Sequence, residues 1–262
     1  MSVADRLRLG VMLLAGVPAL RASDILLASF PRSGSTLLRF VVTHYALGLA
    51  GDASEVPFAR LNRLAPELGA SWLWSAPLQP GAPRGRFPRW VKTHRPYFWG
   101  LARPRAVHLV RSPLDALASY HRYWTARVGA APVERGAFLH DPRRGLPRWI
   151  RHTRSWEGHA DVVLRYRDLR ADPARAVTEV LSAFGVDVDA QTVAEAAARS
   201  SADAVRALER SGGVAGPDRL GAGAVFAADR PPGSGTAYFS PSDVAWARAR
   251  LTEAGLGAWV GP

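Results

Sequence analysis

A short run of small and basic residues, PRSGST at 31–36, contains the groups from which proteins build anion sites. Gly34 would let the backbone approach an oxyanion closely, and Ser35 and Thr36 offer hydroxyl donors. Arg32 adds a permanent cation whose guanidinium can hold a phosphate or sulfonate group through two hydrogen bonds. An apolar segment precedes the run and an amphipathic one follows it, so the run would open a helix. Residues 31–36 therefore predict a cradle for a phosphate-like group.

This loop departs from the ATP-binding pattern G-x-x-x-x-G-K-[ST]. The first glycine is missing, and Ser35 stands where that pattern has lysine. Without the lysine, transfer of a γ-phosphoryl group from ATP is less favoured, whereas a 5′-linked diphosphate-like group still suits the loop. A phosphotransferase is an alternative only if another residue replaces that lysine.

A second candidate phosphate site is HLVRSPLDALASYHRYW at 108–124. Arg111 ends an apolar, strand-like run, which is where a parallel sheet presents its ligands. Ser119 follows eight residues later, on the second turn of the next predicted helix, so both side chains could converge on one phosphate. Taken alone, an ion pair between Arg111 and Asp115 would be the simpler explanation. Beside the first loop, the phosphate site is favoured.

Lys92 and His94 are two residues apart in WVKTHRPYFW at 90–99, so in a strand their side chains share one face. Lys92 is the single lysine of the chain. An unperturbed imidazole titrates near pH ~6.5 and can accept a proton at neutral pH. The alternative is a hydrogen-bonded structural histidine, which is also what we expect for His44, His108, His121, His140, His152 and His159.

The elements that must position these residues follow from the hydrophobic pattern. Short apolar runs predict strands at 24–30, 89–93, 105–110 and 161–166. Helical spacing and capping signals predict helices at 35–47, 114–127, 172–184, 189–199, 201–210 and 243–254. Proline and glycine predict loop-rich stretches at 52–88, 128–148 and 211–236. Strands that alternate with helices predict an α/β fold with a parallel sheet.

The composition limits the possible functions. The chain has 262 residues, 48% of them hydrophobic and 21% charged, which is a globular balance. It has no cysteine, which excludes disulfides, thiolate zinc sites, Fe–S clusters and a cysteine nucleophile. The net charge, 34 − 22 = +12, attracts anions such as nucleic acid, an anionic membrane or a phosphorylated small molecule.

Residues 1–23 have the outline of a signal peptide, with a basic start and an apolar run at 9–20. The run is shorter than the ~20 residues that span a bilayer as a helix, and no clean small-residue cleavage site follows it. We therefore expect an N-terminal helix that packs on a single domain covering 1–262, in a cytoplasmic protein with no membrane partner.

Four segments carry a resemblance to a known family. SFPRSGSTLLR at 29–39 resembles the 5′-phosphosulfate-binding loop of the sulfotransferases, T-Y-P-K-S-G-T-T-W, and 108–124 resembles their 3′-phosphate segment, R-x-P-x-D-x-x-x-S. Residues 162–186 resemble the family's strand, Y-E-D-L-x-x-D-P and helix unit, and 228–241 is a looser match to its late R-K-G segment. Over 24–245 the chain is similar to cytosolic-type sulfotransferases, and we interpret it as a bacterial member.

The resemblance implies a P-loop-like three-layer fold with a central parallel sheet flanked by helices. It implies metal-free transfer of a sulfuryl group from 3′-phosphoadenosine 5′-phosphosulfate (PAPS) to a hydroxyl group, which leaves PAP. His94 would be the general base, Lys92 would stabilise the transferring sulfonate, and Arg32 would replace the family's loop lysine. The implied cofactor contacts are Arg32, Ser33, Gly34, Ser35, Thr36, Arg111, Ser119, Tyr166, Arg230 and Gly233.

The sequence departs from the family pattern around the adenine. Leu37 stands where the family's loop has tryptophan, and Ala202 where it commonly has phenylalanine. Aliphatic packing or other aromatic residues would then hold the base.

The acceptor is expected to be a small molecule with a hydroxyl group: a phenol, an alcohol, a sugar or a hydroxylated natural product in a tailoring pathway. Four aromatic residues near the motifs are candidates for its pocket, with core packing as the alternative: Trp99, Trp124, Tyr97 and Phe98.

Other functions stay open. R-S-G-S-T-L-L also resembles the tyrosine-peptide sulfotransferases, which use a carboxylate base. An arginine-rich nucleic-acid-binding protein ranks lowest, because the arginines are dispersed and no nucleic-acid-binding module is recognisable. The sequence does not indicate an oligomeric state.

Overall fold

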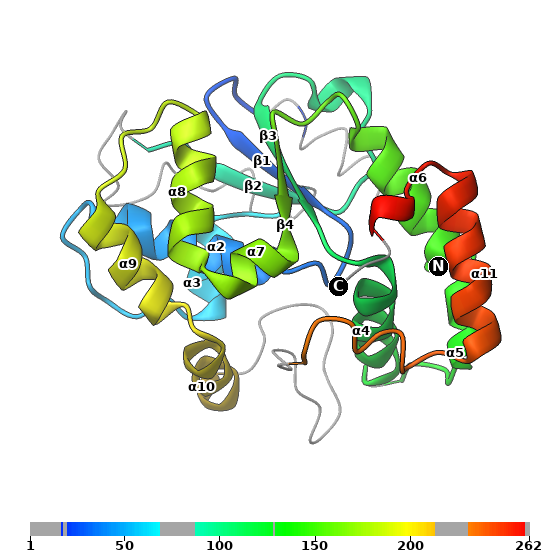
Figure 1. Ribbon diagram of the computed structural model, residues 1–262. Helices are drawn as coiled ribbons and strands as arrows, with labels where there is room; N and C mark the ends of the chain where they lie inside the picture. The colour runs from blue at the N-terminus through cyan, green and yellow to red at the C-terminus, as the bar shows by residue number, and fades with distance from the viewer. Residues whose placement is uncertain (1–16, 18–19, 69–86, 128, 213–229, 260–262) are drawn as a thin grey trace.

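The computed structural model describes residue 17 and residues 20–68, 87–127, 129–212 and 230–259, and its centre is a sheet of four parallel strands (Figure 1). These are β1 (Ile25–Ser29), β2 (Trp90–Thr93), β3 (Arg105–Val110) and β4 (Val162–Arg165), in the order β2-β1-β3-β4. All strand pairs are parallel, so the four carboxyl ends lie at one edge of the sheet. The residues that follow these ends are therefore brought together.

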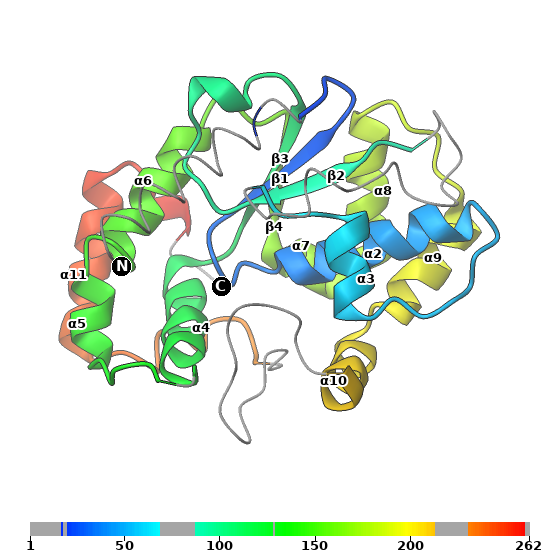
Figure 2. The same ribbon diagram turned by 180° about the vertical axis from the view of Figure 1, so that it is seen from behind.

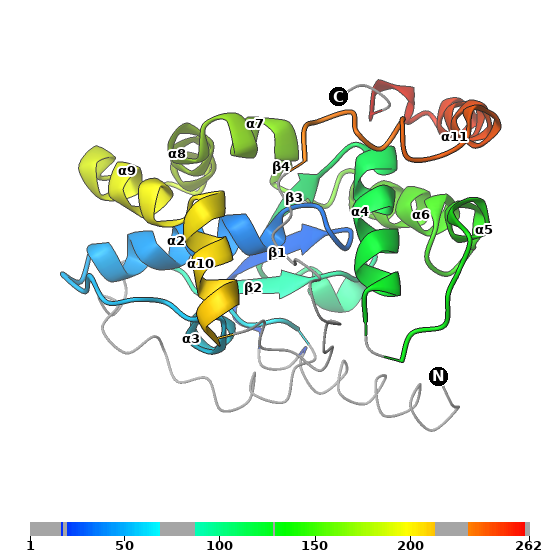
Figure 3. The ribbon, with the colours of Figure 1, turned by 90° about the horizontal axis from the view of Figure 1, so that it is seen from below.

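Helices cover both faces of the sheet. They are α2 (Ser35–Gly48), α3 (Phe58–Leu64), α4 (Pro113–Thr125), α5 (Arg135–His140), α6 (Leu146–Trp156), α7 (Tyr166–Ala171), α8 (Pro173–Ala183), α9 (Ala190–Arg199), α10 (Ala202–Gly212) and α11 (Pro241–Glu253), with short 3₁₀ turns η3 (Trp99–Leu101) and η4 (Gly257–Trp259). The sheet lies between a group formed by α2, α8 and α9 and a group formed by α4, α5 and α6 (Figure 3). This is the three-layer arrangement that the sequence predicts.

Alternation along β1 explains how both layers attach. Ile25 and Leu27 pack into the core cluster shared with α2, α8 and α9, whereas Leu26 and Ala28 pack against Trp156 of α6. Because successive strand residues point to opposite faces, an unbroken apolar strand is buried on both sides.

The predicted strands and most predicted helices agree with the structure within a few residues. The structure adds α3 and α5 within stretches predicted as loop-rich, and also α6 and α7, which were not predicted. Proline misled the prediction, since Pro57 is the N-cap of α3 and Pro147 lies in the first turn of α6. At those positions proline starts a helix rather than breaking it.

Figure 2 shows α3 beside α2, near the β2 edge of the sheet. None of the helices in the described part of the chain is long and apolar enough to cross a membrane. Most of the helix expected at 1–23, and 213–229 of the loop expected at 211–236, lie outside the described residues.

Candidate active site

The loop after β1 has an unusual backbone. Arg32 has φ 67° and Gly34 has φ 98°, and Arg32 is the only residue other than glycine with positive φ among those that the structure describes. A left-handed conformation costs an L-residue roughly 1–2 kcal/mol, and such strain is often kept where a ligand is clamped. No side chain caps α2, and its first turn has no acidic residue. The start of α2 is therefore electropositive and suited to an anion.

The structure brings the two predicted phosphate motifs together. Arg32 Nε donates to Ser119 Oγ at 3.3 Å, and an Arg111 guanidinium N–H donates to the Arg32 carbonyl at 3.1 Å. These contacts join residues that are 87 and 79 positions apart in the chain. The β1 loop and the start of α4 thus lie in direct contact at the carboxyl edge of the sheet, with Arg32 and Arg111 side by side.

Two buried polar atoms at this surface have no hydrogen-bond partner, Ser33 Oγ and Arg111 Nε. Buried polar groups are usually hydrogen-bonded. The unpaired Ser33 hydroxyl and the unpaired Arg111 N–H therefore mark where a ligand would bond. Burial lowers the pKa of Arg32 to about 10, which still leaves the guanidinium charged at neutral pH.

Tyr166, which directly follows β4, lies against both predicted phosphate motifs. The Arg111 guanidinium lies 4.6 Å from the centre of the Tyr166 ring. The ring also fills the space beside Gly34, where a Cβ atom would come within 2.3 Å of Tyr166 Cδ2. Gly34 is therefore required twice, for its backbone conformation and for the close approach of the ring.

His94 follows β2 and contacts the end of β1. Its Nδ1 lies 2.7 Å from the Ser29 carbonyl oxygen, which can only accept. Nδ1 therefore carries the proton, and Nε2 keeps its lone pair. Burial and the nearby Lys92 ammonium lower the pKa of His94 to about 3, so the ring is neutral at neutral pH.

Lys92 is paired with Glu67, a residue that the sequence did not single out. Lys92 Nζ lies 3.0 Å from Glu67 Oε2, and the backbone of residues 66–68 bonds to Lys92 on the free side of β2. Burial would raise the pKa of the Glu67 carboxyl, but Lys92 and His94 together lower it to about 2. One sequence signal could have found this residue, since Glu67 is the only acidic residue between Glu55 and Asp115.

The late segment at 230–236 lies against the start of α4. The Asp115 carboxylate accepts hydrogen bonds from the Gly233 and Gly235 N–H groups, at 2.8 and 2.6 Å. Neither oxygen forms an ion pair with Arg111 among the described residues. Arg230 is exposed, and its carbonyl accepts from Arg170. The Gly233 N–H expected to face a phosphate is thus already bonded to Asp115.

The four candidate pocket aromatics do not gather in one pocket. Tyr97 stacks on His159, with ring centres 3.7 Å apart, and Phe98 packs in the cluster on the same face of the sheet as Tyr97. Trp124 packs against the cluster around α4, whereas Trp99 is 83% exposed. Core packing thus accounts for three of the four.

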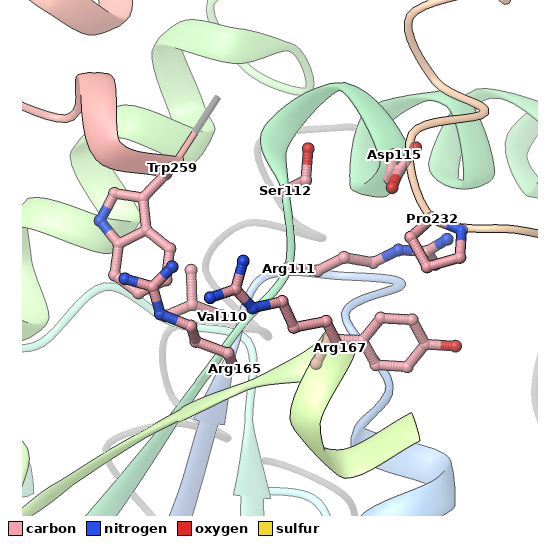
Figure 4. A pocket seen from close by; sticks show the side chains of 9 residues that line it. Val110, Arg111, Ser112, Asp115, Arg165, Arg167, Pro232 and Trp259 are labelled. Atoms are coloured by element: carbon pink, nitrogen blue, oxygen red, sulfur yellow. The ribbon is translucent and has the colours of Figure 1, made fainter. Parts of the chain in front are cut away.

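A hollow next to Arg111 contains arginines that the sequence did not indicate (Figure 4). Its lining consists of Val110, Arg111, Ser112, Asp115, Arg165, Tyr166, Arg167, Pro232 and Trp259. The described residues contain no group of three or more His, Asp or Glu side chains that could hold a metal ion.

Residues 22–216 match the family described as "Sulfotransferase domain". The chain belongs to this family. The matched range contains the β1 loop, Lys92, His94, the 111–119 motif and Tyr166, and it ends before Arg230 and Gly233.

Curated relatives agree. Sulfotransferase 4A1 of human is 26% identical over 187 residues, which cover 64% of this chain and 62% of that protein. Bovine sulfotransferase 1A1 is 26% identical over 202 residues, 68% of this chain and 64% of that protein. The match thus spans somewhat less than two thirds of the length of these relatives.

Solved structures support the fold. A structure of retinol dehydratase with retinol and PAP has a TM-score of 0.68 at 16% identity, over 90% of this chain and 82% of that one. Mouse sulfotransferase SULT7A1 with PAP has a TM-score of 0.64 at 19% identity, over 92% and 88%. The predicted family and the predicted P-loop-like fold are both confirmed.

Proposed function

We propose that this protein is an enzyme that transfers a sulfuryl group from PAPS to a hydroxyl group of a small-molecule acceptor. Membership of the sulfotransferase domain family supports this proposal. The observation that carries it is the contact of the β1 loop with the 111–119 motif, through Arg32, Ser119 and Arg111. Two anion-binding motifs that meet suit a nucleotide with negative groups at both its 5′ and 3′ positions.

The residues present fit such a nucleotide. The unpaired Ser33 hydroxyl, the uncapped start of α2 and the hydroxyls of Ser35 and Thr36 would hold the 5′ end, together with Arg32. PAPS, when bound, supplies a sulfuryl group attached to a phosphate leaving group.

The 3′-phosphate would be bound by Arg111, whose Nε has no partner, and by Ser119. Tyr166 would pack beside the nucleotide. In this proposal Arg230 adds charge, and Gly233 acts through its bond to Asp115, which fixes the late segment against α4.

We infer that His94 takes the proton of the acceptor hydroxyl at Nε2, because Nδ1 is held by the Ser29 carbonyl. Lys92 would offset charge on the transferring group. Burial is the larger cause of the low pKa of His94 and the Lys92 ammonium is the smaller one, so an anion bound near Lys92 would raise this pKa in part.

Glu67 supports one alternative for the base. Its side chain is 41% exposed and its Oε2 lies 3.0 Å from Lys92 Nζ, so a carboxylate base, as in the tyrosine-peptide branch, has a concrete candidate. His94→Gln and Glu67→Gln separate the two. If His94 is the base, His94→Gln removes turnover while PAP still binds, and Glu67→Gln retains turnover. The opposite result would assign the base to Glu67.

Calorimetry with PAP is the decisive experiment for the nucleotide. We expect PAP to bind and ATP to bind much more weakly, and Arg111→Ala to weaken PAP binding by about 10–150-fold, since a charged hydrogen bond is worth roughly 1.5–3 kcal/mol. No heat with folded protein would refute the proposal. Steeply salt-dependent DNA binding that Arg111→Ala leaves unchanged would favour the nucleic-acid-binding alternative instead.

The acceptor is best sought with apolar alcohols and phenols. Among the four candidate aromatics, Trp99 is the one most available to an acceptor, because it is 83% exposed in the η3 turn between β2 and β3. Tyr97, Phe98 and Trp124 are less available. A turnover screen with PAPS and phenols, aliphatic alcohols and sugars would identify the class, and Trp99→Ala should raise the KM for it without changing PAP affinity.

A further inference from the structure

The hollow in Figure 4 lies where β3 and β4 end, and three arginines line it. Counted together with the solvent at its open side, it has a volume of about 380 Å³. In Figure 4, Arg165 and Arg167 reach toward the side of Trp259 and Ser112, whereas Arg111 runs toward Pro232. Four segments that are distant in the sequence therefore enclose one small basic space.

The carboxylates near this space do not balance its arginines, because Asp115 is the one acidic residue in a lining that contains Arg111, Arg165 and Arg167. Both Asp115 oxygens accept from backbone N–H groups of residues 233 and 235. Asp168 lies 3.5 Å from Arg167, but about half of each side chain is exposed and the pair is screened by solvent. Arg165 stacks 4.5 Å from the Trp259 ring, and no carboxylate pairs with it among the residues that the structure describes. The hollow thus keeps an excess of positive charge, which attracts anions.

The hollow is separate from the nucleotide cradle. Tyr166 turns toward Gly34 and contacts Arg111, while its two neighbours in sequence, Arg165 and Arg167, line the hollow on the Trp259 side. No residue of the 30–36 loop lines it, and neither does Ser119. The two sites share a wall formed by Arg111 and Tyr166.

We propose that this hollow is a second anion site, which binds a tetrahedral oxyanion, phosphate or sulfate, either free or as a monoester. Arg165 and Arg167 hold the anion from the β4 side, and the Ser112 hydroxyl, which does not cap α4, donates from the other. The site goes beyond the proposed sulfuryl transfer, because Arg165, Arg167 and Ser112, which would bond the anion, lie outside the nucleotide cradle.

The test uses the full chain and inorganic phosphate as the probe, with calorimetry in a low-salt buffer. Arg165→Gln/Arg167→Gln should weaken phosphate binding at least tenfold. The matched control, Arg103→Gln/Arg248→Gln, removes the same charge from exposed positions outside the hollow and should change binding less than twofold. Arg32→Gln, which disables the cradle, should leave this phosphate site intact.

The single variant Arg167→Gln, at a side chain that is 52% exposed, repeats the test with little risk to folding.

Three results would overturn the proposal: no phosphate binding by the wild-type chain, equal loss in the control pair, or loss of phosphate binding in Arg32→Gln with the hollow variants unaffected. PAP affinity gives a further criterion. It should change less than threefold in the double variant, and a larger loss would make the hollow part of the nucleotide site. Phenyl phosphate distinguishes the sources, since tighter binding than inorganic phosphate indicates a monoester and equal binding indicates the free ion.

Discussion

Replacing Gly34 by alanine should lower the free energy of unfolding by more than the backbone cost of alanine at a glycine with positive φ. Gly34 has φ 98°, a conformation that costs alanine roughly 1–2 kcal/mol. The new Cβ would also lie 2.3 Å from Tyr166 Cδ2 and 2.5 Å from Cε2, so the ring must move. Moving the ring disrupts its stacking with Arg111 at 4.6 Å, worth roughly 0.5–2 kcal/mol. The expected loss in the free energy of unfolding is therefore about 1.5–4 kcal/mol.

Gly158→Ala is the matched control. Gly158 has φ 72°, and a Cβ atom added there would meet nothing within 4 Å, so alanine carries only the backbone cost of roughly 1–2 kcal/mol. Urea unfolding of both variants gives the difference. In a Tyr166→Ala background the excess cost of Gly34→Ala should disappear, because the clashing ring is gone. Equal costs for Gly34→Ala and Gly158→Ala would refute the packing argument.

Two further predictions concern stability. His44 and His108 are buried with pKa values lowered to about 4, so both are neutral when folded and take up protons on unfolding below pH 6.5. Stability should fall as the pH drops from 6.5 toward 4, by about 2 kcal/mol per histidine at pH 5, and pH-independent urea unfolding between pH 7 and 5 would contradict this. Asp115→Asn leaves at least one of the two glycine N–H groups without an acceptor and should cost roughly 1–3 kcal/mol in thermal unfolding, whereas Asp168→Asn, at a half-exposed side chain, should cost less than about 0.5 kcal/mol.

The strands and the motifs that follow them could be predicted from the sequence, because each strand is a short apolar run that ends at a polar motif. β1 ends before PRSGST, β2 includes Lys92, and β3 ends before Arg111. Parallel strands collect those ends at one edge, so a pattern that is local in sequence predicts a site that is local in space.

Contacts between segments that are distant in the sequence could not be predicted from it. Glu67 reaches Lys92 only because residues 66–68 lie along β2, and no periodicity marks that pairing. Arg165 and Arg167 are the sequence neighbours of Tyr166, and both line the hollow. Trp259, which also lines the hollow, lies almost a hundred residues later, so the sequence around Tyr166 does not predict it. Sequence patterns describe which face a residue occupies and leave open what covers that face.

The register of β2 determines whether Lys92 and His94 can serve the site. Lys92 pairs with Leu27 and Thr93 with Ala28, so His94 comes level with Ser29, whose carbonyl holds its Nδ1. A slip of one residue would turn Lys92 and His94 to the opposite face, because the side-chain period of a strand is two. The buried Trp90 and Val91 oppose such a slip, since it would move both apolar side chains out of their clusters. The proton position on His94 is thus a consequence of core packing three and four residues earlier in the chain, at Val91 and Trp90.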